Sequence, residues 1–315
     1  MFEEEKEKVE NGIKKLLKSK LPEELYDASA YLILAGGKRL RPILAMKVCE
    51  FLDGDDKNKA IPLGVSLELI HNFTLLHDDI MDKDETRRGV KTAHMVYGEP
   101  FAILAGDTLF SLAFENIAEN YEGEIARKTS LEIAKMTREI CDGQALDMLF
   151  EKRNDVGEEE YTDMIYKKTA RLFESGARCG ALIANAGKRE IENMARMGKN
   201  LGMGFQMADD VLDLTGKEEK IGKRIGNDIR RGKKTLIAIH ALKNASCEQR
   251  KKIVSTLGNG NAGEGEIKEV IEIFDKIGSI GYSQSVVRRY FEEAKKGVKK
   301  GPLLDLINFM ERREA

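Results

Sequence analysis

Proline is scarce in this sequence, and the place where it is missing is informative. Only five prolines occur in 315 residues, and none lies between Pro100 and Pro302. Because proline breaks the interior of a helix, so long a stretch without it favours an all-helical body. In the segments 66–80 and 196–214, apolar residues recur at helical rather than alternating spacing. We therefore expect an all-α protein, and since no repeat or linker interrupts the chain, residues 1–315 are predicted to form a single helical domain.

Cysteine, tryptophan and long apolar runs are also scarce. The four cysteines lie far apart, without the CxxC pairs or cysteine–histidine clusters that bind zinc, and are predicted to be free thiols in a reducing compartment. Tryptophan is absent, aromatic residues make up 6%, and the net charge is −2, so nothing favours a nucleic-acid partner. No run without Asp, Glu, Lys or Arg exceeds eleven residues, whereas a membrane span needs roughly 20. Since the acidic N-terminus lacks the apolar core of a signal peptide, we expect a cytoplasmic protein without a membrane anchor.

An acidic cluster, Asp78-Asp79-Ile80-Met81-Asp82, ends the apolar segment 69–77. On a helix, Asp78 and Asp82 lie one turn apart on the same face. Like charges at this spacing destabilise a helix by a few tenths of a kcal/mol, and burial of unpaired carboxylates costs several kcal/mol. A bound cation would offset both costs.

A second cluster, Asp209-Asp210-Val211-Leu212-Asp213, repeats the pattern after the apolar run 203–208. One DDxxD motif is weak support for a site, because acidic pairs often cap or solvate a helix. Two copies that each end a long apolar run are much stronger. Oxygen ligands suit a hard ion such as magnesium, which takes one or two carboxylates and completes its shell with water and substrate phosphates. Two facing clusters would therefore clamp a diphosphate.

Basic residues suited to phosphate lie on either side of the first cluster. Arg87 and Arg88 follow it, and the segment 36–42 reads GGKRLRP. Glycines let the backbone approach an anion closely, and arginine offers a planar fork for phosphate oxygens. The alternative for 36–42 is an ordinary helix stop of glycine, cation and proline. Such a stop needs one glycine and one cation, whereas three cations occur here within four residues.

Four further candidate residues lie on predicted helices, and two of them have an equally simple structural explanation. His71 precedes Asp78 by seven residues, two turns or roughly 10 Å along the same helix face, but a histidine among apolar residues is usually a core residue. Gln206 precedes Asp210 by four and is expected to bond a carboxylate, a substrate phosphate or a neighbouring helix. Lys168-Thr169 lies on a helix that otherwise looks internal.

The segment 216–234 is the most unusual stretch, with four glycines and eleven charged residues. It is either a solvated connector or a lid that brings Lys223 and Lys233 to an anion. Composition alone slightly favours the connector.

Together these motifs resemble the trans-isoprenyl diphosphate (polyprenyl) synthases, and most closely the geranylgeranyl diphosphate synthases. The resemblance covers residues 21–300, and six pieces match in order: GGKRLRP (36–42), LIHNFTLLHDDIMD (69–82), RRG (87–89), KTA (168–170), GFQMADDVLD (204–213) and GKRIGNDIRRGKKT (222–235). It departs at Lys91 and Ile237, where many relatives have proline, and Arg224 is a further variable position; none of the three is a proposed ligand. The resemblance implies an all-α bundle around a deep central cavity and a homodimer. It also implies magnesium-dependent, head-to-tail, trans condensation of isopentenyl diphosphate with allylic diphosphates, releasing pyrophosphate.

The resemblance also implies a role for each candidate residue. Two or three magnesium ions would be held by Asp78, Asp82 and Asp209, supported by Asp79 and Asp213. The allylic diphosphate would contact Arg87, Lys168, Lys223 and Lys233. The diphosphate of isopentenyl diphosphate would contact Lys38, Arg41, His71 and Arg88. The developing carbocation would lie near Thr169 and Gln206. The expected catalytic set is Asp78, Asp82, Arg87, Lys168, Thr169, Gln206, Asp209 and Lys223.

Product length should depend on the apolar pocket beneath Asp78. Thr74 lies one turn before Asp78 and is small, whereas Phe73 lies five residues before it, roughly 7 Å along the axis. In the family, a bulky aromatic at this position beside a small residue resembles the pattern for a C20 product. We expect geranylgeranyl diphosphate, with farnesyl and longer diphosphates as alternatives. The alternative is that Phe73 is an ordinary core residue and that the floor of the pocket lies elsewhere.

Three other functions compete with this one. A non-catalytic partner subunit of a prenyl synthase would tend to lose one acidic cluster, and both are intact here. A terpene cyclase would share the first cluster, but the segment 36–42 and the second DDxxD favour a second diphosphate substrate. A helical scaffold without ligands predicts that Asp78, Asp82 and Asp209 are solvated and far apart.

Overall fold

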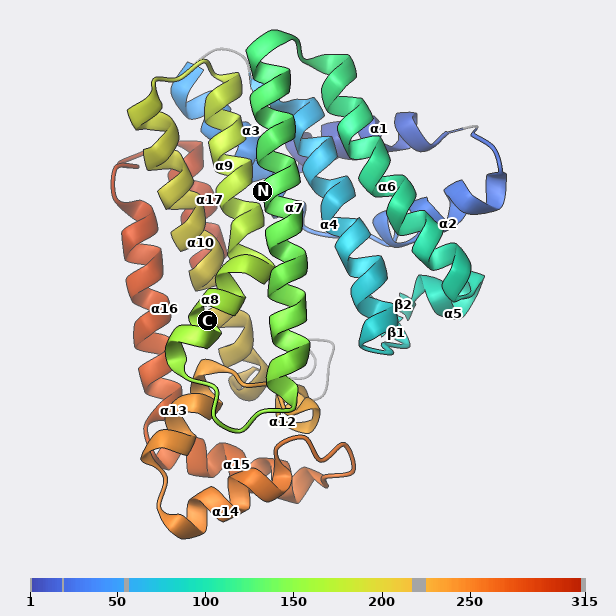
Figure 1. The fold of residues 1–315 in the computed structure, drawn as a ribbon. Helices are drawn as coiled ribbons and strands as arrows, with labels where there is room; N and C mark the ends of the chain where they lie inside the picture. The colour runs from blue at the N-terminus through green and yellow to red at the C-terminus, as the bar shows by residue number, and fades with distance from the viewer. Residues whose placement is uncertain (1, 19, 54–56, 217–224, 313–315) are drawn as a thin grey trace. The chain divides into compact units, whose positions relative to one another are not determined.

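The computed structural model describes residues 2–18, 20–53, 57–216 and 225–312 (Figure 1). Helices dominate this part of the chain, and its strands are limited to one two-stranded hairpin. The expectation of an all-α fold is confirmed. The contacts divide the chain into two compact units: residues 1–137, 172–195 and 301–303 form the first, and residues 138–171, 196–300 and 304–315 form the second.

The first unit contains the N-terminal helices and the hairpin. Its elements are α1 (Glu3–Leu17), α2 (Glu23–Leu34), α3 (Leu40–Asp53), the 3-10 turn η1 (Lys57–Ala60), α4 (Ile61–Met81), β1 (Thr86–Arg87), β2 (Val90–Lys91), α5 (Ala93–Tyr97), α6 (Glu99–Asn120), the first half of α7 (Gly123–Glu151), α9 (Arg171–Ile183) and the start of α10 (Lys188–Thr215). Helix α4 has a proline in its first turn, where the missing N–H has no helical partner. It packs mainly along α6 and is also covered by α1 and α3 (Figure 1).

The second unit contains the rest of α7 and α10 and the C-terminal helices. Its further elements are α8 (Glu158–Ile165), the π-helix η2 (Tyr166–Ala170), α12 (Asn227–Arg231), α13 (Leu236–Asn244), α14 (Cys247–Thr256), α15 (Glu264–Lys276), α16 (Ser279–Lys295) and most of α17 (Pro302–Glu311). The end of α10 packs with the helices from α12 through α16 in one apolar core. This core includes Val211, Ile237, Val270 and Phe274. This core fixes the helix that carries the second aspartate cluster.

Helix α6 is the single described helix that is long and apolar enough to cross a membrane by length and composition. Such a helix is weak support for a membrane span, because core helices pass the same test. Here 44% of its apolar window is buried inside the protein. Its contacts with α4, α2 and α5 account for that buried face.

Candidate functional site

The first aspartate cluster lies at the C-terminal end of α4. Asp78 and Asp79 belong to the last turn of the helix, and Asp82 is its C-cap. The Asp82 N–H donates to the Asp78 carbonyl oxygen at 2.8 Å, and Asp82 keeps helical dihedral angles. Asp78 and Asp82 are therefore one turn apart on one face, which is the arrangement that the sequence predicts. Both are half-buried.

Asp79 points into the protein instead. Its side chain is 1% exposed, and Arg87 Nε lies 2.5 Å from its Oδ1. Burial raises the pKa of Asp79, although the charge and the hydrogen bond of Arg87 oppose that rise. The other oxygen, Oδ2, is buried without a hydrogen-bond partner among the described residues. The carboxylate of Asp79 therefore anchors Arg87, which also lies 3.6 Å from Asp84.

The hairpin after α4 sets the position of Arg88. Thr86 pairs with Lys91 and Arg87 with Val90, which leaves Arg88 and Gly89 as a two-residue loop. Both have positive φ, 54° and 78°, as a type I′ turn requires. The turn directs Arg88 back to the body of the unit, where its Nη1 donates to the Leu32 carbonyl oxygen at 2.8 Å.

All four residues predicted for isopentenyl diphosphate belong to this unit. Arg41 Nη1 lies 3.0 Å from His71 Nε2, and its guanidinium lies over the Phe173 ring at 4.8 Å. Burial first, and then the charges of Arg41 and Arg88, hold the pKa of His71 well below its usual value. His71 is therefore neutral and accepts the hydrogen bond from Arg41. Lys38 is exposed, in the loop between α2 and α3.

This arrangement predicts a pH dependence of stability. The unfolded chain protonates His71 near pH 6.5, whereas the folded protein does not. The contribution of neutral His71 is therefore complete above pH 6.5 and is lost as the pH falls below it, by up to about 1.4 kcal/mol per pH unit. We expect the urea midpoint to fall less between pH 7.5 and 5.5 in His71→Gln than in the parent protein. An equal fall in both proteins would show that His71 does not carry this dependence.

Phe73, one of the two residues predicted to set product length, belongs to an aromatic cluster between α4 and α6. The Phe73 ring lies 4.9 Å from the His77 ring and 5.5 Å from the Phe110 ring, and Phe110 lies 5.1 Å from Phe114. Thr74 Oγ1 donates to the His71 carbonyl oxygen at 2.8 Å. Phe110 could not be predicted from the sequence, because its contact with Phe73 joins residues 37 positions apart.

In the second unit, Lys168 and Thr169 lie in the π-helix η2, a feature that the sequence analysis did not predict. Turns of this kind are frequent at functional sites. Lys168 Nζ lies 2.5 Å from Oδ2 of Asp147, on α7. A Cβ added to Gly143, one turn before Asp147, would lie 2.3 Å from the Lys168 backbone nitrogen. Helix α7 therefore touches the backbone of η2, and glycine is needed at that contact.

The second aspartate cluster follows the same design as the first. Asp209 and Asp213 are half-buried on α10, and the middle residue, Asp210, is buried. Asp210 accepts hydrogen bonds from Tyr161 Oη at 2.7 Å and from Gln206 Nε2 at 3.0 Å. Burial raises the pKa of Asp210 to about 7, and the nearby charge of Asp228 adds to this rise.

Two other residues predicted for this unit have clear partners. Gln206 Oε1 accepts a hydrogen bond from Thr169 Oγ1 at 3.1 Å, so the expectation that Gln206 bonds a carboxylate is met together with a bond to η2. Asp213 Oδ2 accepts a hydrogen bond at 3.1 Å from the backbone N–H of Asp228, at the start of α12. This contact holds the end of α10 against α12.

Lys233 also lies among carboxylates, 3.4 Å from Asp228. Burial alone would lower the pKa of Lys233, but the charges of Asp228, Asp147 and Asp210 outweigh that effect and raise it. Its ammonium therefore stays charged beside the aspartates. Lys223 lies outside the described residues, as does most of the first half of the proposed lid 216–234.

The donor set fits magnesium that is completed by a substrate. Among the residues that the structure describes, no three His, Cys, Asp or Glu side chains form a metal site on their own. Each unit instead offers two aspartates one helical turn apart. Magnesium commonly takes one or two carboxylates and fills the remaining positions with water and phosphate oxygens. The chain thus has the ligands of an open site rather than a closed protein cage.

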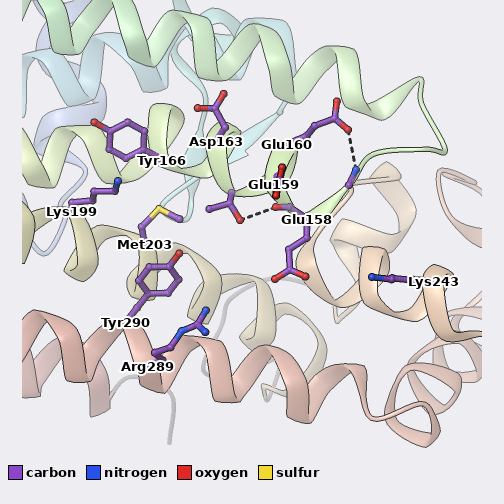
Figure 2. Close-up of a pocket in the computed structure, with 12 residues that line it drawn as sticks. Glu158, Glu159, Glu160, Asp163, Tyr166, Lys199, Met203, Lys243, Arg289 and Tyr290 are labelled. Atoms are coloured by element: carbon purple, nitrogen blue, oxygen red, sulfur yellow. Dashed lines mark hydrogen bonds between the residues drawn. The ribbon is translucent and has the colours of Figure 1, made fainter.

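A surface pocket of about 950 Å³ lies elsewhere in the second unit (Figure 2). It is lined by residues of α8, η2, α10, α13 and α16, among them Glu159, Tyr166, Lys199, Lys243 and Arg289. None of the predicted site residues lines it. Its wall includes Tyr166, the first residue of η2, whose ring lies 4.5 Å below Lys199 Nζ.

Comparisons with known proteins agree with the motifs. The polyprenyl synthetase family model matches residues 22–274. The chain is 42% identical over 315 residues to a geranylgeranyl diphosphate synthase of Methanosarcina mazei, covering 97% of this chain and 95% of that one. It is 43% identical over 289 residues to a geranylfarnesyl diphosphate synthase of Aeropyrum pernix, covering 90% of each.

Solved structures are also similar to this chain. A geranylgeranyl pyrophosphate synthetase of Pyrococcus horikoshii superposes with a TM-score of 0.93 at 39% identity, covering 98% of this chain and 95% of that one. A polyprenyl synthase of Caulobacter crescentus, complexed with calcium and isoprenyl diphosphate, gives a TM-score of 0.88 at 30% identity, covering 100% and 96%.

Proposed function

We propose a specific reaction for this chain, which belongs to the polyprenyl synthetase family. It is a trans-isoprenyl diphosphate synthase that joins isopentenyl diphosphate head-to-tail to an allylic diphosphate and releases pyrophosphate. The observation that carries the proposal is the pair of aspartate clusters on α4 and α10, each accompanied by cations within its own unit. A helical scaffold would have no use for such a repeated arrangement.

Magnesium, bound by Asp78, Asp82 and Asp209 with Asp79 and Asp213 in support, would supply positive charge to the leaving diphosphate. We assign two or three ions to the site. The calcium in the Caulobacter crescentus relative supports a divalent metal in this family. Asp79 and Asp213 support the site through the protein contacts that they make, with Arg87 and with the start of α12.

The chain's own cations divide between the two diphosphates. Lys168, Lys233, Arg87 and Lys223 would neutralise the allylic diphosphate as it leaves, which is electrostatic stabilisation of developing charge. Lys38, Arg41 and Arg88 would bind the second diphosphate, and neutral His71 would orient Arg41 through their 3.0 Å contact. Thr169 and Gln206, bonded to each other, would present oxygen atoms to the allylic cation.

We propose geranylgeranyl diphosphate as the product, with Phe73 as the floor of the product pocket. The relative from Methanosarcina mazei bears that name, whereas the relative from Aeropyrum pernix makes the next longer diphosphate by name. The rings of Phe73, Phe110 and Phe114 lie in contact, and such a cluster is bulky enough to serve as this floor.

Removal of the Phe73 ring is therefore expected to lengthen the product. Phe73→Ala should shift the main product from C20 to C25 or longer, measured by chromatography of the dephosphorylated alcohols. Thr74→Ser, which changes little volume on the same helix turn, is the control and should keep the C20 product. A product distribution unchanged by Phe73→Ala would place the floor elsewhere.

We further propose that residues 1–315 form one polyprenyl-synthase domain, and that the protein works in the cytoplasm as a homodimer without a membrane anchor. Ile103 and Leu104, neighbours on α6, are 44% and 51% exposed, and such apolar surface supports association of two copies. Light scattering of the purified protein would measure the oligomeric state.

Product analysis tests the proposed function. The purified protein is incubated with magnesium, labelled isopentenyl diphosphate and the C5, C10 or C15 allylic diphosphate. A dominant C20 alcohol that disappears with a chelator is the expected result. A C15 or longer product would retain the chemistry and reject the assignment of length. No condensation with any starter would overturn the synthase and favour a non-catalytic partner subunit.

A further inference from the structure

A buried carboxylate lies inside the basic part of the first unit. Glu68, on α4, is 2% exposed, although the helix around it is apolar. Its Oε1 accepts hydrogen bonds from Arg39 Nη1 at 2.7 Å and from Asn72 Nδ2 at 3.0 Å. A buried charge needs such partners, because an unpaired one is strongly disfavoured. Glu68 therefore binds the side chains of Arg39 and Asn72 at the same time.

Arg39 connects Glu68 to the loop before α3. Arg39 is 3% exposed and has a φ of 50°, which is uncommon for a residue other than glycine. Besides Glu68, its guanidinium donates to the carbonyl oxygens of Ile33 at 2.6 Å and Gly36 at 3.2 Å. Arg39 thus fixes the backbone between Lys38 and Arg41 by a side chain that faces inward.

Asn72 connects Glu68 to the hairpin that carries Arg88. Asn72 receives Arg88 Nη1 at 3.4 Å on its Oδ1, while its Nδ2 donates to Glu68. A Cβ added to Gly37 would lie 2.8 Å from Arg39 Nη1 and 3.3 Å from Arg88 Cζ, so the two guanidiniums lie close together beneath Gly37. Like charges this close need a counter-charge.

The electrostatics agree with that geometry. Burial lowers the pKa of Arg88, and the charges of Arg39 and Arg87 lower it further, while the carboxylate of Glu68 opposes them. Glu68 is thus the buried carboxylate that offsets repulsion between Arg39 and Arg88. Glu10, 3.2 Å from Arg39, and Asp79, near Arg88, add to this effect.

We propose that Glu68 is a positioning residue for the subsite of isopentenyl diphosphate. It joins the loop of Lys38 and Arg41 to the hairpin of Arg88, and so holds these cations in one arrangement for a diphosphate. It acts through its buried hydrogen bonds to Arg39 and Asn72 and does not contact the diphosphate itself. This inference rests on the proposed function.

The test replaces Glu68 with glutamine, which keeps the shape of the side chain and removes its charge. Glu68→Gln is expected to raise KM for isopentenyl diphosphate at least tenfold. The kcat at saturating isopentenyl diphosphate and the KM for the allylic diphosphate should stay within about twofold. A purely structural role would instead change all three, or none.

Two further variants sharpen the test. Glu5→Gln is the matched control, because Glu5 is also buried, in an ion pair with Lys47 at 2.7 Å in the same unit. It should lower Tm and leave KM unchanged. Glu68→Gln combined with Asn72→Asp returns a carboxylate one turn away, beside Arg88, and is expected to recover at least half of the lost affinity.

The outcomes separate this inference from the proposed function. If the parent protein makes no product, the proposed function fails. If the parent is active and folded Glu68→Gln has an unchanged KM for isopentenyl diphosphate, the positioning role alone is refuted. If Glu68→Gln does not fold, Asn72→Ala, which removes the bridge between Glu68 and Arg88 and leaves the Glu68–Arg39 pair in place, must raise the same KM severalfold, and no increase would overturn the inference.

Discussion

Replacement of Asp78 with asparagine is expected to lower kcat by about 10²–10³-fold while the protein stays folded. Loss of one preorganised group that stabilises developing charge has an effect of roughly this size. Asparagine keeps the shape and one oxygen but removes the negative charge that holds a divalent cation. Since Asp78 and Asp82 repel each other one turn apart, stability should stay the same or rise by a few tenths of a kcal/mol.

Asp79→Asn is the matched comparison, because it changes the neighbouring residue in the same way. Asp79 is buried and paired with Arg87 at 2.5 Å. Loss of its charge should therefore destabilise the protein by about 1–3 kcal/mol. Steady-state kinetics over a magnesium series and urea unfolding of both variants measure the two effects. If Asp78→Asn retained the parent kcat, or lost as much stability as Asp79→Asn, Asp78 would be a structural residue.

The contrast between the outer aspartates and the buried middle aspartate also explains which parts of the site could be predicted from the sequence. The i, i+4 spacing of Asp78 and Asp82 is a property of one helix, so local periodicity was sufficient to predict it. The absence of proline and the helical spacing of apolar residues predicted the all-α fold for the same reason. Each of these inferences needs only neighbours within a few residues.

The inward direction of the middle aspartates could not be predicted in this way. Asp79 pairs with Arg87 in the hairpin. Asp210 bonds Gln206 one turn away, but also Tyr161, which lies 49 positions from it. The sequence analysis grouped Asp79 with the metal-supporting residues and left Asp210 without a role. The structure gives the two equivalent places: Asp79 ties its cluster to the hairpin through Arg87, and Asp210 ties its cluster to α8 through Tyr161. Only tertiary contacts distinguish them from the outer aspartates.

Two signals in the sequence did point to hidden contacts. Glu68 interrupts an otherwise apolar run, and a charge in such a run indicates a buried partner. Gly143 lies inside a long helix, where glycine is less favourable than alanine by roughly 0.5–1 kcal/mol. Each suggests that something approaches closely, but neither identifies Arg39 or Lys168 as the neighbour.

The contact at Gly143 leads to the second large effect. Gly143→Ala would place a Cβ 2.3 Å from the Lys168 nitrogen and 2.7 Å from its Cα, both backbone atoms that cannot rotate away. Either α7 or η2 must move, and overpacking of this kind typically destabilises by about 1–3 kcal/mol. The better helix propensity of alanine offsets only about 1 kcal/mol of that loss in stability.

The larger consequence is for activity, because η2 carries both Lys168 and Thr169. A shift of about 1 Å in positioned groups can reduce rates by roughly 10²-fold, so we expect a loss of that order in kcat for Gly143→Ala. Gly281, on α16, is the matched control, since an added Cβ meets nothing within 4 Å. Gly281→Ala should stabilise the protein by up to about 1 kcal/mol and leave kcat unchanged. If both variants were equally stable and active, the close approach of α7 would not be what holds the π-helix in its working position.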